Sequence, residues 1–458
     1  MLKYELIVEY IKKEISHGNL TPRKKLPSIR KTAEQFECSI GTVLAAYNSL
    51  EKDHIIYSEA KSGYYILDSE FSTKNNFQNQ LIDFSSGAPD IETLPYKSFQ
   101  HCLNNSIQIY GETLFSYCDP RGLNSLIQVM TEHLKDYQIF TKPENIVITT
   151  GSQQALNLLS LMPFPNGNAN VLVEQPTYYG MIKSLELNNI PAIGIERGLG
   201  GLDLNEMEKL FKYSNIKFFY TVPRFHNPTG YSYNKREREA IVKMAEKYNV
   251  YILEDDIMAD LDNDKKYDPM YAYDKSSKVI YLKSYSKVLM PGLRIAALVL
   301  PKILINTFLE YKKWSDMNSP ILSQGALEIY LKSGMFSKHR TKINKFYSER
   351  MDCFREVTSQ LKHPNINWST PVSGYFACLY VEGQIDYDKI MNMLCNENIK
   401  MLDTSACFLK EYKTNSYFRI SVSKADNIKI KQGIPKVFHA VKNNLCKSND
   451  EINNNLMI

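Results

Sequence analysis

The sequence lacks the features that most readily place a chain in a membrane, an oxidising compartment or a metal site. No run approaches the roughly 18 apolar residues of a membrane-spanning helix, since the best candidate, Ile295 to Leu300, ends at Pro301. The eight cysteines have no short paired spacing, which argues against a disulfide framework and a zinc site. The N-terminal segment carries acidic residues and no signal-type apolar core. We therefore expect an intracellular, cytoplasmic protein with neither a membrane nor a metal as partner.

The chain does have the size and composition of a folded protein with more than one domain. Its 458 residues are 43% hydrophobic and 23% charged, and the net charge of +5 implies no partner by itself. Residues 68–80 are polar and without periodicity, as in a flexible tether. The sequence thus predicts one domain over residues 1–67, a linker over 68–80 and a larger domain over 81–458.

The first 67 residues have the spacing of three short amphipathic helices followed by a β-hairpin. Ser28 and Ser39 stand where the second and third helices would begin, because a serine side chain can accept from a free backbone N–H group there. Two β-like runs, 55–57 and 64–67, flank Ser62-Gly63. The apolar stripes of the helices are Ile7, Ile11 and Ile15; Ile29, Ala33 and Phe36; and Val43, Tyr47 and Leu50. This order predicts a winged helix-turn-helix.

Positive charge is concentrated in one part of this segment. Residues 1–67 hold ten Lys and Arg against eight Asp and Glu, yet five basic residues fall within nine positions that contain no acid. Such a patch can contact DNA phosphates regardless of sequence. A solvated helix face would show the same charges, so charge alone leaves both interpretations open. The five residues are Arg23, Lys24, Lys25, Arg30 and Lys31.

Several motifs in this segment resemble the GntR-type winged helix. They are Gly18-Asn19-Leu20, the run KLPSIR over 25–30, Thr42-Val43 with Ala46-Tyr47 and Leu50, and Ser62-Gly63. The resemblance implies a double-stranded DNA operator as partner. The DNA contacts that it implies, together with the basic patch, are Arg23, Lys25, Ser28, Arg30, Lys31, Ser39, Gly41, Thr42 and Gly63. Two positions depart from the family: Ile40 replaces an arginine and His54 a glycine, so the sequence preference should differ.

Short apolar runs alternate with helical patterns throughout the larger domain. The runs are 146–148, 171–173, 218–220, 251–253, 279–282 and 296–300. This alternation predicts an α/β domain with a mostly parallel sheet, in which ligands bind beyond the carboxyl ends of the strands. Five runs are followed by polar segments at that position. These are Gly151-Ser152-Gln153, Pro176-Thr177-Tyr178, Asn227-Pro228-Thr229-Gly230, Glu254-Asp255-Asp256 and Ser284-Tyr285-Ser286-Lys287.

The five segments together suit pyridoxal 5′-phosphate (PLP). Lys287 supplies an amine for an imine, and Asp255 can keep the pyridine nitrogen protonated. Asn227 can donate to the phenolic oxygen, and Tyr178 can stack on the ring. The phosphate would be held by free N–H groups at a helix N-terminus and by hydroxyl and guanidinium donors. Those phosphate contacts are Gly151, Ser152, Gln153, Ser284, Ser286 and Arg294. Each residue alone has a more ordinary explanation, such as a surface lysine or a core tyrosine.

The same segments resemble the fold-type I, class I aminotransferases over almost the whole domain. The matching motifs are GSQQAL, ExPxYxG, NPTG, EDD, SxSK with PGLR, and FRIS at 418–421. The resemblance implies that Lys287 forms the internal aldimine and that Arg419 binds the α-carboxylate of an amino acid. It also implies that Tyr117 reaches the neighbouring subunit's phosphate, hence a homodimer. A smaller C-terminal α+β subdomain is expected over about residues 310–445.

One departure from the aminotransferases affects the expected chemistry. The family has a tyrosine two or three residues after the acid, where it hydrogen-bonds the phenolic oxygen, and here those positions hold Ile257 and Met258. Proton handling during transamination is therefore in doubt. The glycine-rich segment 198–201 lacks the later glycine of a dinucleotide loop, and we interpret it as a turn.

A GntR-like winged helix fused to an aminotransferase-like domain is the layout of the MocR-type transcription regulators. Our leading prediction is a PLP-dependent, homodimeric DNA-binding regulator that senses PLP, an amino acid or an amine through the Lys287 imine. The alternative is an active aminotransferase that carries a helix-turn-helix. A third possibility is a PLP reservoir or structural protein with neither activity.

Overall fold

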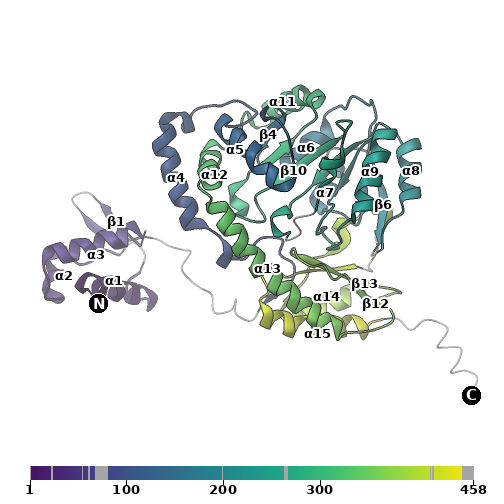
Figure 1. The fold of residues 1–458 in the computed structure, drawn as a ribbon. Coiled ribbons are helices and arrows are strands. Elements are labelled where there is room, and N and C mark those ends of the chain that lie inside the picture. The colour runs from purple at the N-terminus through teal and green to yellow at the C-terminus, as the bar shows by residue number, and fades with distance from the viewer. Residues whose placement is uncertain are drawn as a thin grey trace, which may run out of the picture. The chain divides into compact units, whose positions relative to one another are not determined.

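The structure is a computed structural model, which describes residues 2–21, 24–53, 55–59, 62–67, 81–198, 200–262, 267–412, 414 and 417–445. The chain divides into two compact units, residues 1–80 and 81–458 (Figure 1). Across these described ranges, no helix is both long enough and apolar enough to span a membrane.

The first unit is a winged helix, which confirms the predicted fold of this segment. Its elements are α1 (Lys3–Ser16), α2 (Ile29–Gln35), α3 (Ile40–Lys52), β1 (Ile56–Glu59) and β2 (Gly63–Ile66). The two strands are antiparallel, with Ile56 opposite Ile66. Ser28 Oγ accepts from the Lys31 amide at 3.3 Å, so the predicted helix cap forms. The stripes meet in a core whose fully buried members include Ile7, Val43, Ala46, Tyr47 and Leu50.

The second unit is built on an eight-stranded sheet. Its order is β4 (Ile146–Thr149), β11 (Ala296–Val299), β10 (Val279–Ser284), β9 (Tyr251–Asp255), β8 (Ile216–Thr221), β5 (Asn170–Gln175), β6 (Ala192–Gly198) and β7 (Gly201–Leu202). Strands β10, β9, β8, β5 and β6 are parallel, whereas β11 runs antiparallel to β10 and β4. The mostly parallel sheet is therefore confirmed. The turn expected at 198–201 joins β6 to β7, and Leu199 within it lies outside the described residues.

Helices cover both faces of this sheet (Figure 1). Val171 and Val173 of β5 are buried in one apolar cluster and Leu172 in another, as expected for a strand with neither face exposed to water. The helices of this layer are α4 (Tyr96–Tyr110), α5 (Asn124–Leu134), α6 (Ser152–Leu161), α7 (Tyr179–Leu187), α8 (Leu204–Tyr213), α9 (Lys235–Lys247), α10 (Met270–Tyr273), α11 (Lys302–Asp316) and α12 (Ile321–Lys332).

The C-terminal part of the second unit has a smaller sheet and its own apolar core. Strand β13 lies between β12 and β15, with Cys378 opposite Arg419, and all three strands are antiparallel. A second pair, β3 and β14, brings residues 82–83 beside residues 399–400. The elements are β3 (Ile82–Asp83), α13 (Met335–Ser359), β12 (Ile366–Trp368), β13 (Phe376–Val381), α14 (Tyr387–Asn396), β14 (Ile399–Lys400), β15 (Tyr417–Ser421) and α15 (Asn427–Lys442).

Candidate ligand site at the sheet edge and candidate DNA-binding face

The five polar segments leave the large sheet at the same edge. Strands β10, β9, β8 and β5 are parallel, and β4 shares their direction because β11 runs antiparallel to both β4 and β10. Lys287 follows β10 by three residues, Asp255 ends β9, and Tyr178 follows β5 by three residues. The edge at which an open α/β sheet binds its ligands thus carries the side chains that the sequence selected.

Lys287 is a half-buried amine and Asp255 a buried acid at this edge. Lys287 Nζ donates to the Gly87 carbonyl oxygen at 2.6 Å. Burial lowers the pKa of Lys287 to about 8, an effect that the Arg419 charge reinforces and the Asp255 charge opposes. Burial also raises the pKa of Asp255 to about 7, against a hydrogen bond that Tyr220 donates to its Oδ2 at 3.0 Å. Shifts of this kind in a cluster are typical of functional sites.

The two carboxylate oxygens of Asp255 differ in their hydrogen bonding. Its Oδ1 is buried and has no hydrogen-bond partner, although the other oxygen accepts from Tyr220. A buried carboxylate oxygen without a donor is costly, and a protonated ring nitrogen is a group that would satisfy it.

A second group of donors lies where α6 begins. Gly151 precedes the helix with φ of +76° and no side-chain cap, so the first N–H groups of α6 can bind an anion. A Cβ on Gly151 would come within 2.5 Å of Arg294 Nη2, hence only glycine allows this approach. Ser286 Oγ is buried without a partner, whereas Ser284 Oγ accepts from the Ser286 amide at 3.3 Å. These residues fit a phosphate.

Tyr178 and Gln153 lie beside this helix start. The Tyr178 hydroxyl donates to Gln153 Oε1 at 3.3 Å, and Gln153 Nε2 donates to the Gly180 carbonyl oxygen at 2.9 Å. Ser152, the first residue of α6, is half-buried. Burial raises the pKa of Tyr178 to about 12, so its phenol stays neutral near pH 7. Its ring packs beside that of Tyr179, with the ring centroids 4.9 Å apart.

Arg419 reaches the edge from β15 of the small sheet. Its Nη1 donates to Asn227 Oδ1 at 3.1 Å and its Nη2 to the Ser85 carbonyl oxygen. Its Nε is buried and has no partner, so one donor remains for an incoming acceptor. Because Asn227 accepts through its oxygen, its amide nitrogen is the atom that can donate to a ligand.

Some groups at the edge were missed by sequence reasoning. The carbonyl oxygens of Ser85 and Gly87 come from backbone, which no residue-type motif reveals. Tyr375, the residue just before β13, donates to the Lys287 carbonyl oxygen. Tyr220 is the phenol that contacts Asp255, although it comes from the neighbouring strand β8.

No tyrosine stands at either of the two positions after Asp255 where the aminotransferases have one. Ile257 and Met258 are buried in the core, 7% and 0% exposed. The phenol that the structure does place beside Asp255 is that of Tyr220, whose hydroxyl donates to Asp255 Oδ2. Tyr117 is 86% exposed and is engaged in no site of its own subunit among the described contacts.

The sequence-selected DNA contacts lie on the winged helix, except Arg23, which lies outside the described residues. Ser28, Ser39 and Thr42 are partly used by helix caps, since Ser39 Oγ accepts from the Thr42 amide at 3.1 Å. Arg30, Lys31 and Gly41 are exposed. Lys25 pairs with Tyr65 in an isolated bridge, and Gly63 has φ of +129° beside Lys25 Cε.

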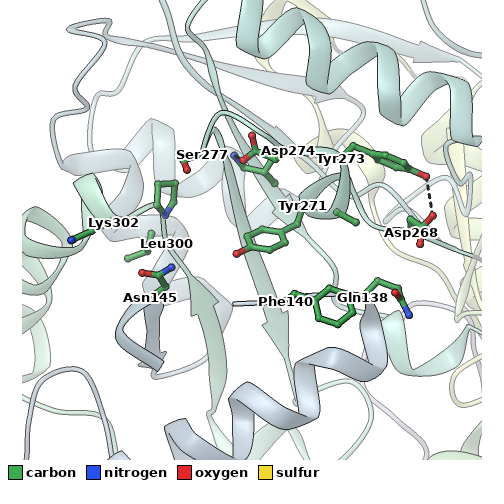
Figure 2. Close-up of a pocket in the computed structure, with 13 residues that line it drawn as sticks. Gln138, Phe140, Asn145, Asp268, Tyr271, Tyr273, Asp274, Ser277, Leu300 and Lys302 are labelled. Atoms are coloured by element: carbon green, nitrogen blue, oxygen red, sulfur yellow. Dashed lines mark hydrogen bonds between the residues drawn. The ribbon is translucent and has the colours of Figure 1, made fainter. Parts of the chain in front are cut away.

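A cavity of about 530 Å³ lies at the opposite edge of the sheet (Figure 2). It is bordered by Val279, where β10 begins, and by Leu300, just after β11. Tyr273 donates to Asp268 across one side at 3.4 Å. None of the residues selected from the sequence lines it, so it is separate from the Lys287 site.

Two family models match the chain. The description "Aminotransferase class I and II" matches residues 79–435, and "Bacterial regulatory proteins, gntR family" matches residues 3–66. Among solved structures, a kynurenine aminotransferase from Pyrococcus horikoshii is 26% identical, with a TM-score of 0.74 over 80% of this chain and 91% of that one. The second unit thus has the fold-type I aminotransferase fold.

The similarity to regulators extends over both units. A Bacillus subtilis protein described as "Uncharacterized HTH-type transcriptional regulator YcxD" is 41% identical over 95% of this chain and 98% of that protein. The regulator NorG of Staphylococcus aureus is 26% identical over 91% and 99%. The chain therefore belongs to the family of HTH-type transcriptional regulators in which a GntR-type winged helix precedes an aminotransferase class I and II domain. The predicted MocR-type layout is confirmed.

Proposed function

We propose that the protein is a homodimeric transcription regulator that binds operator DNA through its winged helix and PLP through Lys287. Binding of PLP, an amino acid or an amine at the sheet edge would shift the positions of the two winged helices on their half-sites. DNA as the target would place the protein in the cytoplasm with the chromosome. The observation that carries the proposal is the convergence of Lys287, Asp255 and the Gly151 cradle in a chain that also has a winged helix.

Each residue at the edge has a task toward PLP. The group supplies, when bound, an electrophilic carbonyl carbon and an electron-withdrawing ring. The Lys287 amine would hold it, and its lowered pKa keeps a fraction of that amine neutral near pH 7. Asp255 Oδ1 would accept from the ring nitrogen, while Tyr220 fixes the other carboxylate oxygen.

The remaining donors would orient the ligand. Arg294, Ser286 and the N–H groups of α6 would bind the phosphate. Arg419 would bind the carboxylate of an amino acid, because it is a buried guanidinium with an unpartnered Nε.

Exposed apolar side chains support the dimer. Ile109 and Phe115 are 66% and 68% exposed, and both lie within the stretch that ends at Tyr117. A second copy that covered this stretch would bury these side chains and would bring Tyr117 to the partner's phosphate donors.

DNA binding is tested by selection of sequences from a random duplex library with the purified full-length protein, with and without PLP. We expect enrichment of one motif, and weaker binding of that motif by Arg30→Ala. Lys12→Ala is the matched control, since Lys12 pairs with Asp53 at 3.0 Å beyond the far end of α3. Failure to enrich any motif in either state would contradict the proposal.

Turnover remains the second candidate function. It is favoured by the contact of Arg419 with Asn227 and by the similarity to an aminotransferase with known substrates. Formation of keto acids from a panel of amino acids, abolished in Lys287→Ala, would establish it. The side chains at 257 and 258 lower our expectation, because neither can exchange a proton.

A further inference from the structure

The first two turns of the exposed side of α3 carry two apolar side chains, and the polar Asn48 follows one turn later. Ile40 is 49% exposed and Leu44 is 36% exposed, and a spacing of four residues places both on one side of the helix. Val43 and Tyr47, on the opposite side, are fully buried in the core of the unit. The exposed pair is therefore not part of the packing that holds the winged helix together.

Gly41 lies between them and has no structural reason to be glycine. Its φ is not positive, and a Cβ would meet only Ser39 Oγ, at an ordinary 3.7 Å. Gly41 is the second residue of α3, so it weakens the helix by less than the about 1 kcal/mol that glycine costs relative to alanine in a helix interior. A glycine at this exposed position leaves room for a partner to approach the helix backbone closely.

Charge lies around this face rather than on it. Residues 40–50 of α3 include no charged side chain, and its hydrogen-bonding groups are few. Arg30 and Lys31 of α2 are exposed, as are Lys24 and Lys25 before it. This arrangement matches DNA, in which phosphates flank a groove whose floor is formed by base edges.

We infer that Ile40 and Leu44 recognise thymine methyl groups in the major groove and that Gly41 allows the helix to approach the bases. The C5-methyl of thymine is the apolar group on the major-groove edge of the standard base pairs, whereas arginine would select guanine. This inference rests on the proposed DNA binding and specifies the bases: each half-site contains thymines opposite Ile40 and Leu44.

The test uses the motif that the full-length protein selects from a random duplex library. Each thymine in the motif is replaced in turn by deoxyuridine, which removes the methyl group and leaves the pairing unchanged. We expect about fourfold weaker binding for each contacted methyl, the value for one buried methyl-sized group. Deoxyuridine outside the motif is the control.

The protein side of the contact is tested on the same duplexes. With Leu44→Ala or Ile40→Ala, one thymine position should become insensitive to deoxyuridine while the others stay sensitive. Gly41→Ala should raise the melting temperature of the winged helix yet weaken motif binding. A merely structural glycine would not separate these two effects.

The outcomes distinguish this inference from the proposal on which it rests. A selected motif whose affinity is unchanged by every deoxyuridine would overturn thymine recognition and leave DNA binding intact. Absence of any selected motif would overturn both. Variants of Ile40 and Leu44 that change the oligomeric state without changing base preference would assign this face to a second copy of the chain, and would also overturn the inference.

Discussion

The sheet-edge site and the DNA-binding face of α3 place their functional groups in opposite environments. At the sheet edge, Asp255 and Arg419 are each 2% exposed, and Asp255 Oδ1 and Arg419 Nε are buried without hydrogen-bond partners. On the winged helix, Ile40 is 49% exposed, and the nearby cations are in contact with water. The groups of the sheet-edge site are therefore shielded from water before any ligand binds, whereas the face of α3 would be shielded only by a bound partner.

This difference determines how function is distributed over residues. A buried charge that loses its partner is left uncompensated, so single changes at the edge should have large effects. An exposed face sums many small contacts, each worth about 1 kcal/mol or less. We therefore expect abrupt losses at the sheet edge and graded losses on α3.

The largest effect is expected from Lys287→Ala. Without the amine, the protein should lose PLP completely on dialysis, as followed by absorbance. The melting temperatures of the PLP-free wild type and the PLP-free variant should differ little, because the substitution also removes the cost of desolvating an amine. Lys332→Ala, at an exposed position, should retain PLP. Full retention of PLP by Lys287→Ala would refute the assignment of this lysine.

The core of the winged helix supplies the next largest effect. Leu50 is fully buried, and Leu50→Ala should destabilise the first unit by about 2–5 kcal/mol. DNA binding should be lost while PLP binding persists, as measured by calorimetry and absorbance. Leu44→Ala, a change of the same residue type on the exposed face, should cost less than about 0.5 kcal/mol. An equal loss of stability in Leu50→Ala and Leu44→Ala would contradict the difference between the buried core and the exposed face.

Gly151→Ala tests the anion cradle. The new Cβ would meet Arg294 at 2.5 Å and would sit at φ of +76° and ψ of 171°, a conformation that costs about 1–3 kcal/mol for residues other than glycine. We expect this loss in stability, together with weaker PLP binding. Gly292→Ala is the matched control, since nothing lies within 4 Å of its Cβ. Unchanged PLP affinity in Gly151→Ala would exclude a phosphate at this position.

The pH dependence of PLP uptake should reflect the lowered pKa of Lys287. The amine must be neutral to react, and a pKa of about 8 means that it loses its proton above pH 8 rather than near its ordinary value. Uptake should therefore be about tenfold faster at pH 9 than at pH 7. Arg419→Met should move the midpoint upward, because the Arg419 charge lowers this pKa. A midpoint above pH 10 in the wild type would contradict the burial effect.

Much of the sheet-edge site could be predicted from sequence, because the residue types indicate both where a strand ends and which side chains can bind a ligand. The apolar runs before Asp255 and Lys287 are continuous, as expected for strands covered on both faces. Ser28 and Ser39 likewise mark the helix starts by their capping chemistry.

What sequence could not reveal depends on backbone atoms and on pairing across the fold. Strand β6 was missed because it carries Glu196 and Arg197, and the buried Arg197 is paired with Glu174 at 2.5 Å and also donates to the Val222 carbonyl oxygen at 3.1 Å. The carbonyl oxygens of residues 85 and 87 reach the site because β3 pairs with β14, a contact over 300 residues apart. Short strands with such distant partners leave no local periodicity.

In the proposed regulator, binding of PLP at the Lys287 site changes the affinity of the winged helix for DNA. The most direct test of this claim is the affinity of the full-length protein for its selected DNA motif, measured in the PLP-loaded and PLP-stripped states. We predict at least a fivefold difference for the wild type, the lower end of typical allosteric coupling, and none for Lys287→Ala. Equal affinities of the two wild-type states would contradict the claim.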